Sequence, residues 1–134
     1  METEMCTMIN KLDNIVKKRR DNASFYWNNL KQFNIFIPPD KENEFNTYHT
    51  FVIQCNKRDE LANFLESRGI KVAIHYPIPI HKQKAYRNLF HENIFMERTE
   101  RQSKRILSLP IHQYLKSNEM DYICKSINYF YQND

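Results

Sequence analysis

The sequence predicts a single α+β (α/β) domain, in which a long N-terminal helix accompanies a small three-stranded sheet covered by helices mainly on one face. The length of 134 residues fits one domain, so we treat residues 1–134 as a unit. Apolar residues make up 41% and charged residues 27%, which is a globular mixture. Short β-branched and aromatic runs alternate with segments of helical apolar spacing, and this alternation predicts the mixed fold.

Residues 2–33 are expected to form one long helix, because they contain neither proline nor glycine. Pro38 and Pro39 follow this segment and exclude its continuation. A basic run at residues 17–20 is expected on the solvated face of the helix. The alternative of an RNA-binding surface is weaker, because the aromatic residues at 25–27 fit a packing face better. The apolar stripe comprises Met5, Met8, Ile9, Leu12, Ile15, Val16, Phe25, Tyr26, Leu30 and Phe33.

A strand, a helix and a second strand are expected next. Residues 48–55 are rich in aromatic and β-branched side chains, which favours a strand. Asn56 is a suitable N-cap for the following helix, and Asp59 suits its first turn. Gly69 stands where a helix commonly ends on a left-handed residue. Residues 70–75 then form the second strand, parallel to the first through a right-handed crossover.

The remaining segments are two short helices, a third strand and a last helix. We expect the short helices at residues 83–90 and 96–105, and a strand at 106–109 that Pro110 ends. This third strand is expected between the other two and antiparallel to them. The last helix is expected to begin at a cap on Ser117 or Asn118 and to reach Tyr131, with an inner face of Met120, Ile123, Cys124 and Ile127.

Composition excludes several classes of protein. The chain has one glycine, Gly69, whereas a P-loop or a dinucleotide-binding fingerprint needs several. The three cysteines form no Cys-x-x-Cys pair, so neither a zinc ribbon nor a disulfide framework is expected. We expect a reducing, cytoplasmic location instead. We expect no signal peptide and no membrane span. The net charge of +4 is too small to indicate nucleic-acid binding.

The densest group of chemically capable side chains lies at residues 75–83. His75, Tyr76, His81 and Gln83 alternate there with two prolines, which stiffen the backbone after a predicted strand. Such a loop holds polar groups in place at little entropic cost, and either imidazole can donate to a phosphate or sugar oxygen or move a proton near neutral pH. The alternative is a proline-ordered loop with surface histidines.

No metal site is expected. His75 and His81 are six residues apart with prolines between them, and His49, His91 and His112 have no fixed sequence relation to them. No cysteine is singled out as a nucleophile beside a histidine, so no catalytic residue is assigned.

The order of the motifs along the chain resembles the C-terminal part of the DegT/DnrJ/StrS family, over residues 1–131. Members of this family are sugar aminotransferases that depend on pyridoxal 5′-phosphate and have the aspartate-aminotransferase fold. The motifs are Lys11-Leu12-Asp13, Arg19-Arg20, Tyr48-His49-Thr50-Phe51-Val52-Ile53, Arg58-Asp59-Glu60-Leu61, Arg68-Gly69-Ile70, His75-Tyr76-Pro77-Ile78-Pro79-Ile80-His81, Gln83, Ala85-Tyr86 and Leu107-Ser108-Leu109-Pro110-Ile111-His112.

The resemblance implies the small domain of that fold, joined in relatives to an N-terminal large domain that holds the cofactor. We therefore expect this chain to begin where the cofactor-binding core ends and to be a truncated form. No lysine here stands in the family's Schiff-base motif, and Lys82 and Lys84 are given no such role. The resemblance thus implies pyridoxal phosphate as a cofactor. The lysine that binds it is expected outside this chain, and no residue of this chain is assigned to contact it.

The implied function is the C-terminal part of a nucleotide-sugar aminotransferase of polysaccharide biosynthesis, which transaminates a keto-sugar nucleotide when the large domain is present. By resemblance, His75, Tyr76 and His81 face the nucleotide-sugar substrate or the mouth of its cleft, and Gln83 and Tyr48 join them.

Whether the chain is itself an enzyme stays open, because alone it is expected to be inactive. The N-terminal helix is expected to contact a large-domain partner chain or a second copy in a homodimer. The alternative function is a non-catalytic sugar-nucleotide-binding or protein-interaction module derived from the same domain.

Overall fold

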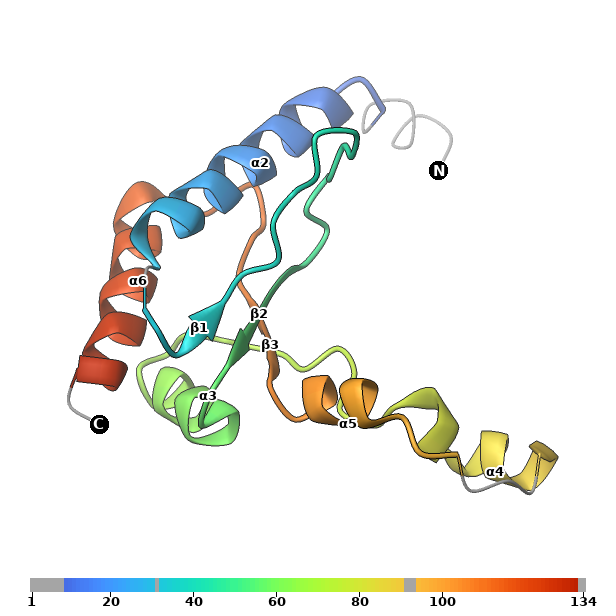
Figure 1. The fold of residues 1–134 in the computed structure, drawn as a ribbon. Coiled ribbons are helices and arrows are strands. Elements are labelled where there is room, and N and C mark those ends of the chain that lie inside the picture. The colour runs from blue at the N-terminus through green and yellow to red at the C-terminus, as the bar shows by residue number, and fades with distance from the viewer. Residues whose placement is uncertain (1–8, 31, 91–93, 133–134) are drawn as a thin grey trace.

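The computed structural model describes residues 9–30, 32–90 and 94–132, and it contains helices on one side of a small sheet (Figure 1). The order of the elements confirms the mixed α+β class. The described elements are α2 (Leu12–Asn29), β1 (Ile35–Phe36), β2 (Phe51–Cys55), α3 (Arg58–Ser67), the 3₁₀ helix η1 (Ile80–Lys82), α4 (Lys84–Phe90), α5 (Glu97–Ser103), β3 (Ile106–Leu109) and α6 (Ser117–Gln132).

The sheet has three strands in the order β1-β2-β3, and both pairings are antiparallel. Phe51 pairs with Leu109, so the beginning of β2 lies beside the end of β3. On the other edge of β3, Ser108 exchanges backbone hydrogen bonds with Ala73. The prediction that the third strand lies antiparallel between the segments at 48–55 and 70–75 is therefore confirmed.

Two predictions about strands were wrong. Residues 70–75 do not form a full strand, because of these residues only Ala73 makes a ladder-type bridge. The third member of the sheet is instead β1, a two-residue strand at Ile35–Phe36. Sequence analysis missed it because so short a run, directly before two prolines, carries no recognisable period.

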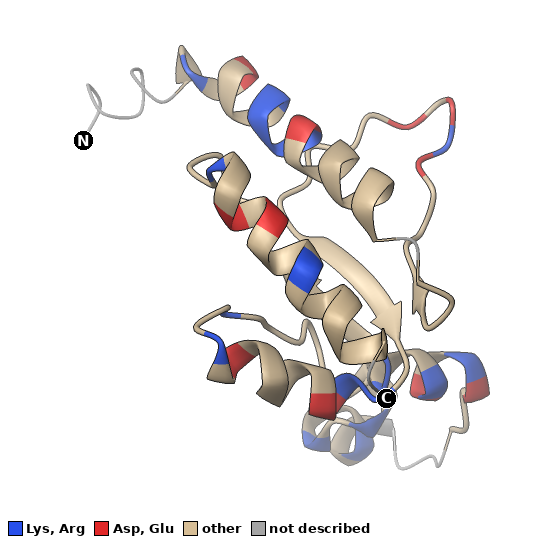
Figure 2. Cartoon of the chain, turned by 90° about the vertical axis from the view of Figure 1, so that its left-hand side faces the viewer, with Lys and Arg blue, Asp and Glu red and all other residues tan. Residues whose placement is uncertain are grey.

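The core lies between the sheet and three helices. Phe51, Ile53 and Cys55 of β2 are buried on one face together with the predicted inner face of α6. Tyr26 of α2 is fully buried, and its hydroxyl donates to the Pro110 carbonyl oxygen at 2.7 Å. In Figure 2 the helices α2, α6 and α3 lie one below another over this face of the sheet. The opposite face of the sheet is left without these helices.

Helix α2 is shorter than predicted. It ends at Asn29, whereas the prediction extended to Phe33, whose side chain is fully exposed. The predicted beginning at residues 2–8 lies outside the described residues. Of the basic run, residues 17 and 18 are exposed as expected, but Arg19 is not a solvated charge. Its Nη1 donates to the carbonyl oxygens of Tyr48 and His49 at 3.2 and 3.1 Å, and so clamps the loop before β2.

The beginning of α3 also differs from the prediction. The N-cap is Lys57, in a left-handed conformation with φ of 50°, and no side chain caps the helix. Asn56, the predicted cap, instead donates through Nδ2 to Asn34 Oδ1 and accepts from Arg105 Nη2. The Asn56 side-chain amide thus joins the residues before β1 and β3 to this turn, and it does not accept a hydrogen bond from the first N–H groups of α3.

The end of α3 confirms the role expected for Gly69. Its φ is +76°, and its N–H donates to the Glu66 carbonyl oxygen. The Ile70 N–H donates to the Leu65 carbonyl oxygen, which completes the paired hydrogen bonds of a Schellman motif. This turn sets the direction in which the chain leaves α3 toward Ala73.

The segment of residues 76–103, here called the arm, carries η1, α4 and α5 and extends away from the body of the molecule (Figure 1). Both short helices were predicted, within two residues at each end. Helix α6 begins at Ser117 and is capped one residue earlier than expected, since the Lys116 N–H donates to Glu119 Oε2. No helix in the described part of the chain is long and apolar enough to cross a membrane.

Candidate functional site

His75 and Tyr76 stand where the chain leaves the sheet and enters the arm. His75 is exposed, and its Nδ1 lies 3.0 Å from the Ser108 hydroxyl oxygen on β3. The peptide bond that joins the two residues is cis, and their rings meet edge to face with centroids 5.6 Å apart. Tyr76 is 74% exposed. The bridge at Ala73 thus holds both side chains at the surface beside β3.

His81 has a different environment from His75. Its side chain is 4% exposed, and Nε2 lies 3.1 Å from Oε1 of Glu100 on α5. The other oxygen of Glu100 pairs with Lys82 Nζ. These hydrogen bonds, that of Lys82 first and that of His81 second, lower the pKa of Glu100 to about 2. The His81 imidazole therefore anchors η1 to α5, and a ligand would reach it only if the arm moved.

Tyr48 is buried, 8% exposed, at the beginning of the strand region. Its hydroxyl donates to Asp40 Oδ2 at 2.6 Å, and its ring packs against Phe51 with centroids 6.0 Å apart. Burial, and then the hydrogen bond with Asp40, raise the pKa of the phenol. Tyr48 therefore ties the loop of residues 40–48 to the core in this structure.

The predicted site residues separate into different depressions. Tyr76 and Gln83 line one of about 270 Å³ in the arm, here called the arm depression, together with Thr99 and Gln102. His75 lines another of about 290 Å³, here called the sheet depression. The structure thus brings Tyr76 together with Gln83 in the arm depression and with His75 through their ring contact, while His81 and Tyr48 lie elsewhere. Their roles toward a substrate stay predictions.

Sequence analysis missed what surrounds His75. The sheet depression is also lined by His49 and His112, although the sequence showed no fixed relation between these histidines and His75. The antiparallel register explains the meeting, because the chain before β2 lies beside the chain after β3. Lys71 lines the same depression, and the period-two spacing of Lys71, Ala73 and His75 is the signal that could have placed it there. His91 lies outside the described residues.

These histidines do not form a metal centre. Within residues 9–30, 32–90 and 94–132, no three His, Cys, Asp or Glu side chains are arranged to hold a metal ion. Cys55 and Cys124 are buried free thiols, and burial raises the pKa of each, that of Cys124 to about 12. Neither thiol is activated as a nucleophile.

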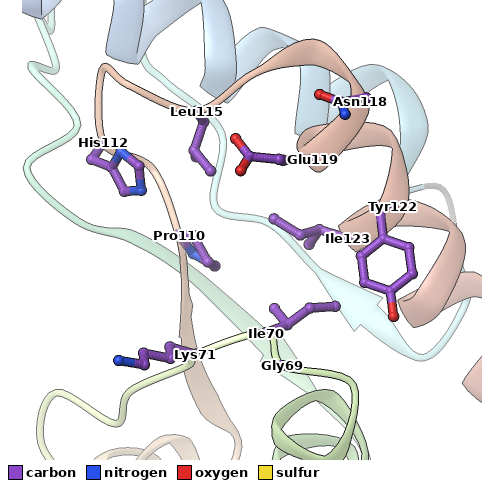
Figure 3. A pocket seen from close by; sticks show the side chains of 10 residues that line it. All are labelled: Gly69, Ile70, Lys71, Pro110, His112, Leu115, Asn118, Glu119, Tyr122 and Ile123. Atoms are coloured by element: carbon purple, nitrogen blue, oxygen red, sulfur yellow. The ribbon is translucent and has the colours of Figure 1, made fainter.

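The largest depression, about 800 Å³, lies between the turn at Gly69, the chain after β3 and the first turns of α6 (Figure 3). Apolar side chains such as Ile70 and Ile123 form much of its wall. Two polar groups there serve the fold: Glu119 caps α6, and the Tyr122 hydroxyl donates to the Arg68 carbonyl oxygen at 3.3 Å. This arrangement carries no evident chemistry.

Comparison with known proteins gives one consistent result. The sequence profile described as the DegT/DnrJ/EryC1/StrS aminotransferase family matches residues 5–128. A pleiotropic regulatory protein of Geobacillus stearothermophilus is 30% identical over 125 residues, which are 91% of this chain and 34% of that protein. The dTDP-3-amino-3,6-dideoxy-α-D-galactopyranose transaminase of Aneurinibacillus thermoaerophilus is 30% identical over 117 residues, which are 87% of this chain and 32% of the enzyme.

Solved structures show the same relation. A DegT DnrJ EryC1 StrS aminotransferase from Brucella abortus superposes with a TM-score of 0.81 and 29% identity, over 91% of this chain and 32% of that one. The structure of DesV from Streptomyces venezuelae gives a TM-score of 0.85 and 27% identity, over 91% and 33%. The chain therefore has the fold of one part of these proteins, and it spans about a third of the length of the curated relatives it matches.

Proposed function

The chain belongs to the DegT/DnrJ/EryC1/StrS aminotransferase family, and we propose that it forms the C-terminal, substrate-facing part of a nucleotide-sugar aminotransferase. The observation that carries this proposal is the family match over residues 5–128, supported by the superposition on sugar aminotransferases. The activity proposed for the whole assembly is the transamination of a keto-sugar nucleotide, in a reducing cytoplasm.

The contribution proposed for this chain is recognition of the sugar nucleotide. His75, Tyr76 and Gln83 place an imidazole, a phenol and an amide on the exposed surface around the arm. Each group can donate or accept hydrogen bonds to sugar hydroxyl or phosphate oxygens. His81 contributes indirectly, because its bond with Glu100 fixes the start of the arm that carries Gln83.

The described residues do not fit pyridoxal phosphate, the cofactor that the family resemblance implies. Such a site needs a lysine for the Schiff base, a carboxylate beside the pyridine nitrogen and a cradle for the phosphate. Lys82 is already paired with Glu100. Lys71 shares the depression of Figure 3 with Glu119, but the Glu119 carboxylate accepts the Lys116 N–H at the start of α6. We therefore derive no step through the cofactor, whose site would be formed by residues outside these 134 or by another chain.

A partner domain is supported by the exposed end of α2. Ile9 and Leu12 are 67% and 53% exposed, and Phe45 beside this end is 73% exposed. The Arg20 guanidinium lies 4.6 Å from the centre of the Phe45 ring. We propose that these side chains contact the large domain of the enzyme or a second copy of the chain.

The second candidate is a non-catalytic module that binds sugar nucleotides or another protein. It is favoured by the poor fit of the described residues to pyridoxal phosphate. The two candidates agree on ligand binding and differ on catalysis, which requires a cofactor-bearing domain in the same assembly.

Nucleotide-sugar binding tests the proposal. We expect dTDP- or UDP-linked sugars to shift the amide signals of His75, Tyr76 and Gln83 in two-dimensional NMR spectra of the labelled chain. Tyr76→Ala should weaken this binding about tenfold, since it removes an aromatic surface and a hydrogen-bonding group. Tyr129→Ala is a matched control, because Tyr129 is a half-exposed tyrosine of α6 that lines neither the arm depression nor the sheet depression. Binding elsewhere, or equal loss in both variants, would contradict the proposal.

A further inference from the structure

We infer that the sheet depression is an oxyanion site that takes the phosphate groups of the ligand. The inference deepens the proposed function, and it rests on that function for the choice of a diphosphate as the natural ligand. The site itself is argued from the floor, the charge and the size of the depression.

The floor is formed by small side chains on the helix-free face of the sheet. Val72 and Ile74 pack against the core, so Ala73 between them faces the opposite side and is exposed. Ser108 is its bridge partner on β3, and the Ser108 hydroxyl meets His75 Nδ1. Ser108 is buried, whereas the exposed Ala73 presents only a methyl group, which leaves room for a ligand beside His75.

The rim carries two positively charged side chains, those of Lys71 and Arg19. The imidazoles of His49, His75 and His112 line the same depression. In Figure 3 the Lys71 side chain extends away from Tyr122, toward the side where the His112 imidazole lies. Among the described residues, no aspartate or glutamate lines this depression. One sign of charge over a concave surface favours an anionic ligand.

Arg19 adds a fixed charge that the surrounding chain does not neutralise. Its guanidinium donates to two backbone carbonyl oxygens and to Gln113 Oε1 at 3.4 Å. All three acceptors are uncharged, and the buried Nε has no hydrogen-bond partner among the described residues. The arginine is therefore held at the rim with its full positive charge available to a bound anion.

The size favours a small ligand group. The volume of about 290 Å³ is just below the range of ~300–1,000 Å³ that is typical of small-molecule sites. The depression therefore suits a phosphate or diphosphate, whose several oxygens can accept charge-assisted hydrogen bonds from Lys71 and hydrogen bonds from imidazole N–H groups. The sugar of a nucleotide sugar would then extend toward Tyr76, which follows His75 directly.

Titration with inorganic pyrophosphate tests this site. The NMR signals of residues 71–75 and 108–112 should move, and the affinity should fall as NaCl is raised. Lys71→Gln and His112→Asn should each weaken binding about tenfold. Lys18→Gln, an exposed lysine of α2 outside the depression, should leave it unchanged. Both Lys71 and His112 are exposed, so circular dichroism should show that these variants fold.

Further ligands show whether the site binds free diphosphate or the diphosphate of a nucleotide. Uridine without phosphate should not move these signals, whereas UDP should move them at least as strongly as pyrophosphate. Absence of binding, or binding that neither Lys71→Gln nor His112→Asn weakens, overturns the inference. If pyrophosphate binds as described but nucleotide sugars do not, the site stands and the proposed function fails. If nucleotide sugars bind and neither Lys71→Gln nor His112→Asn weakens that binding, the function stands and the site fails.

Discussion

His81 was predicted from the sequence to face a ligand, but the sequence did not predict which residues surround it. The motif around it indicated a ligand-facing imidazole, as for His75 six residues earlier. The structure buries His81 against Glu100, a carboxylate 19 residues further along the chain. No pattern in the sequence pairs these two residues, because the pairing depends on how α5 folds back onto η1.

The pH dependence of stability tests the contact between Glu100, His81 and Lys82. The pKa of Glu100 is lowered from 4.5 to about 2, so its stabilisation is present above pH 4.5 and is lost as the pH falls toward 2. We expect Glu100→Gln to lower the melting temperature at pH 7. The difference from the unmodified chain should shrink between pH 4.5 and 2. Thermal unfolding followed by circular dichroism at several pH values measures it.

Glu97→Gln is the matched control for that measurement, since Glu97 is exposed in the first turn of the same helix. It should have little effect at any pH. A Glu100→Gln difference that stays constant from pH 7 to pH 2 would show that the carboxylate charge does not hold the arm.

At the scale of elements, the sequence predicted those whose signals are local. The inner face of α6 was read from apolar spacing, and the end of α3 from Gly69, and both are confirmed. Errors occurred where distant contacts decide. Residues 70–75 have the composition of a strand, but of these residues only Ala73 bridges to β3. Helix α2 stops at Asn29 because the following residues turn into β1.

Local signals and distant contacts divide the residues of the candidate site in the same way. The residues of the His-Tyr-Pro segment were predicted as site residues because they are adjacent in sequence. Lys71 and His112 were not, because the chain after α3 and the chain after β3 meet only across the sheet. Arg19 was not either, because it reaches the depression only through its contacts with the loop before β2. Only period-two spacing from Lys71 to His75 carried a local signal.

Gly69 offers a test of the turn that directs the chain from α3 toward the sheet depression. A Cβ added there would meet nothing within 4 Å, so the cost of Gly69→Ala is the backbone conformation at φ +76° alone. We expect a loss of about 1 kcal/mol in the free energy of unfolding, measured by urea denaturation. Gly69→Asn should cost less, because asparagine tolerates this conformation better. Equal stability of all three chains would exclude a conformational role for the glycine.

At the scale of the whole molecule, the fold presents two unlike sides. Helices α2, α6 and α3 cover one face of the sheet, and the other face and the arm carry the polar residues expected to meet a substrate (Figures 1 and 2). The chain spans about a third of the length of the two curated relatives named above. We propose that these residues form one wall of a substrate site whose other walls lie outside the described residues.

The central claim is that this chain binds substrate groups without holding pyridoxal phosphate by itself. The direct measurement is to add pyridoxal phosphate, reduce with borohydride, and search every lysine for a stoichiometric adduct by mass spectrometry, with a full-length relative as the positive control. The account predicts a single modified lysine in the relative and no stoichiometric adduct in this chain. A stoichiometric adduct on one lysine of this chain would contradict it, because the 134 residues would then contain a Schiff-base site.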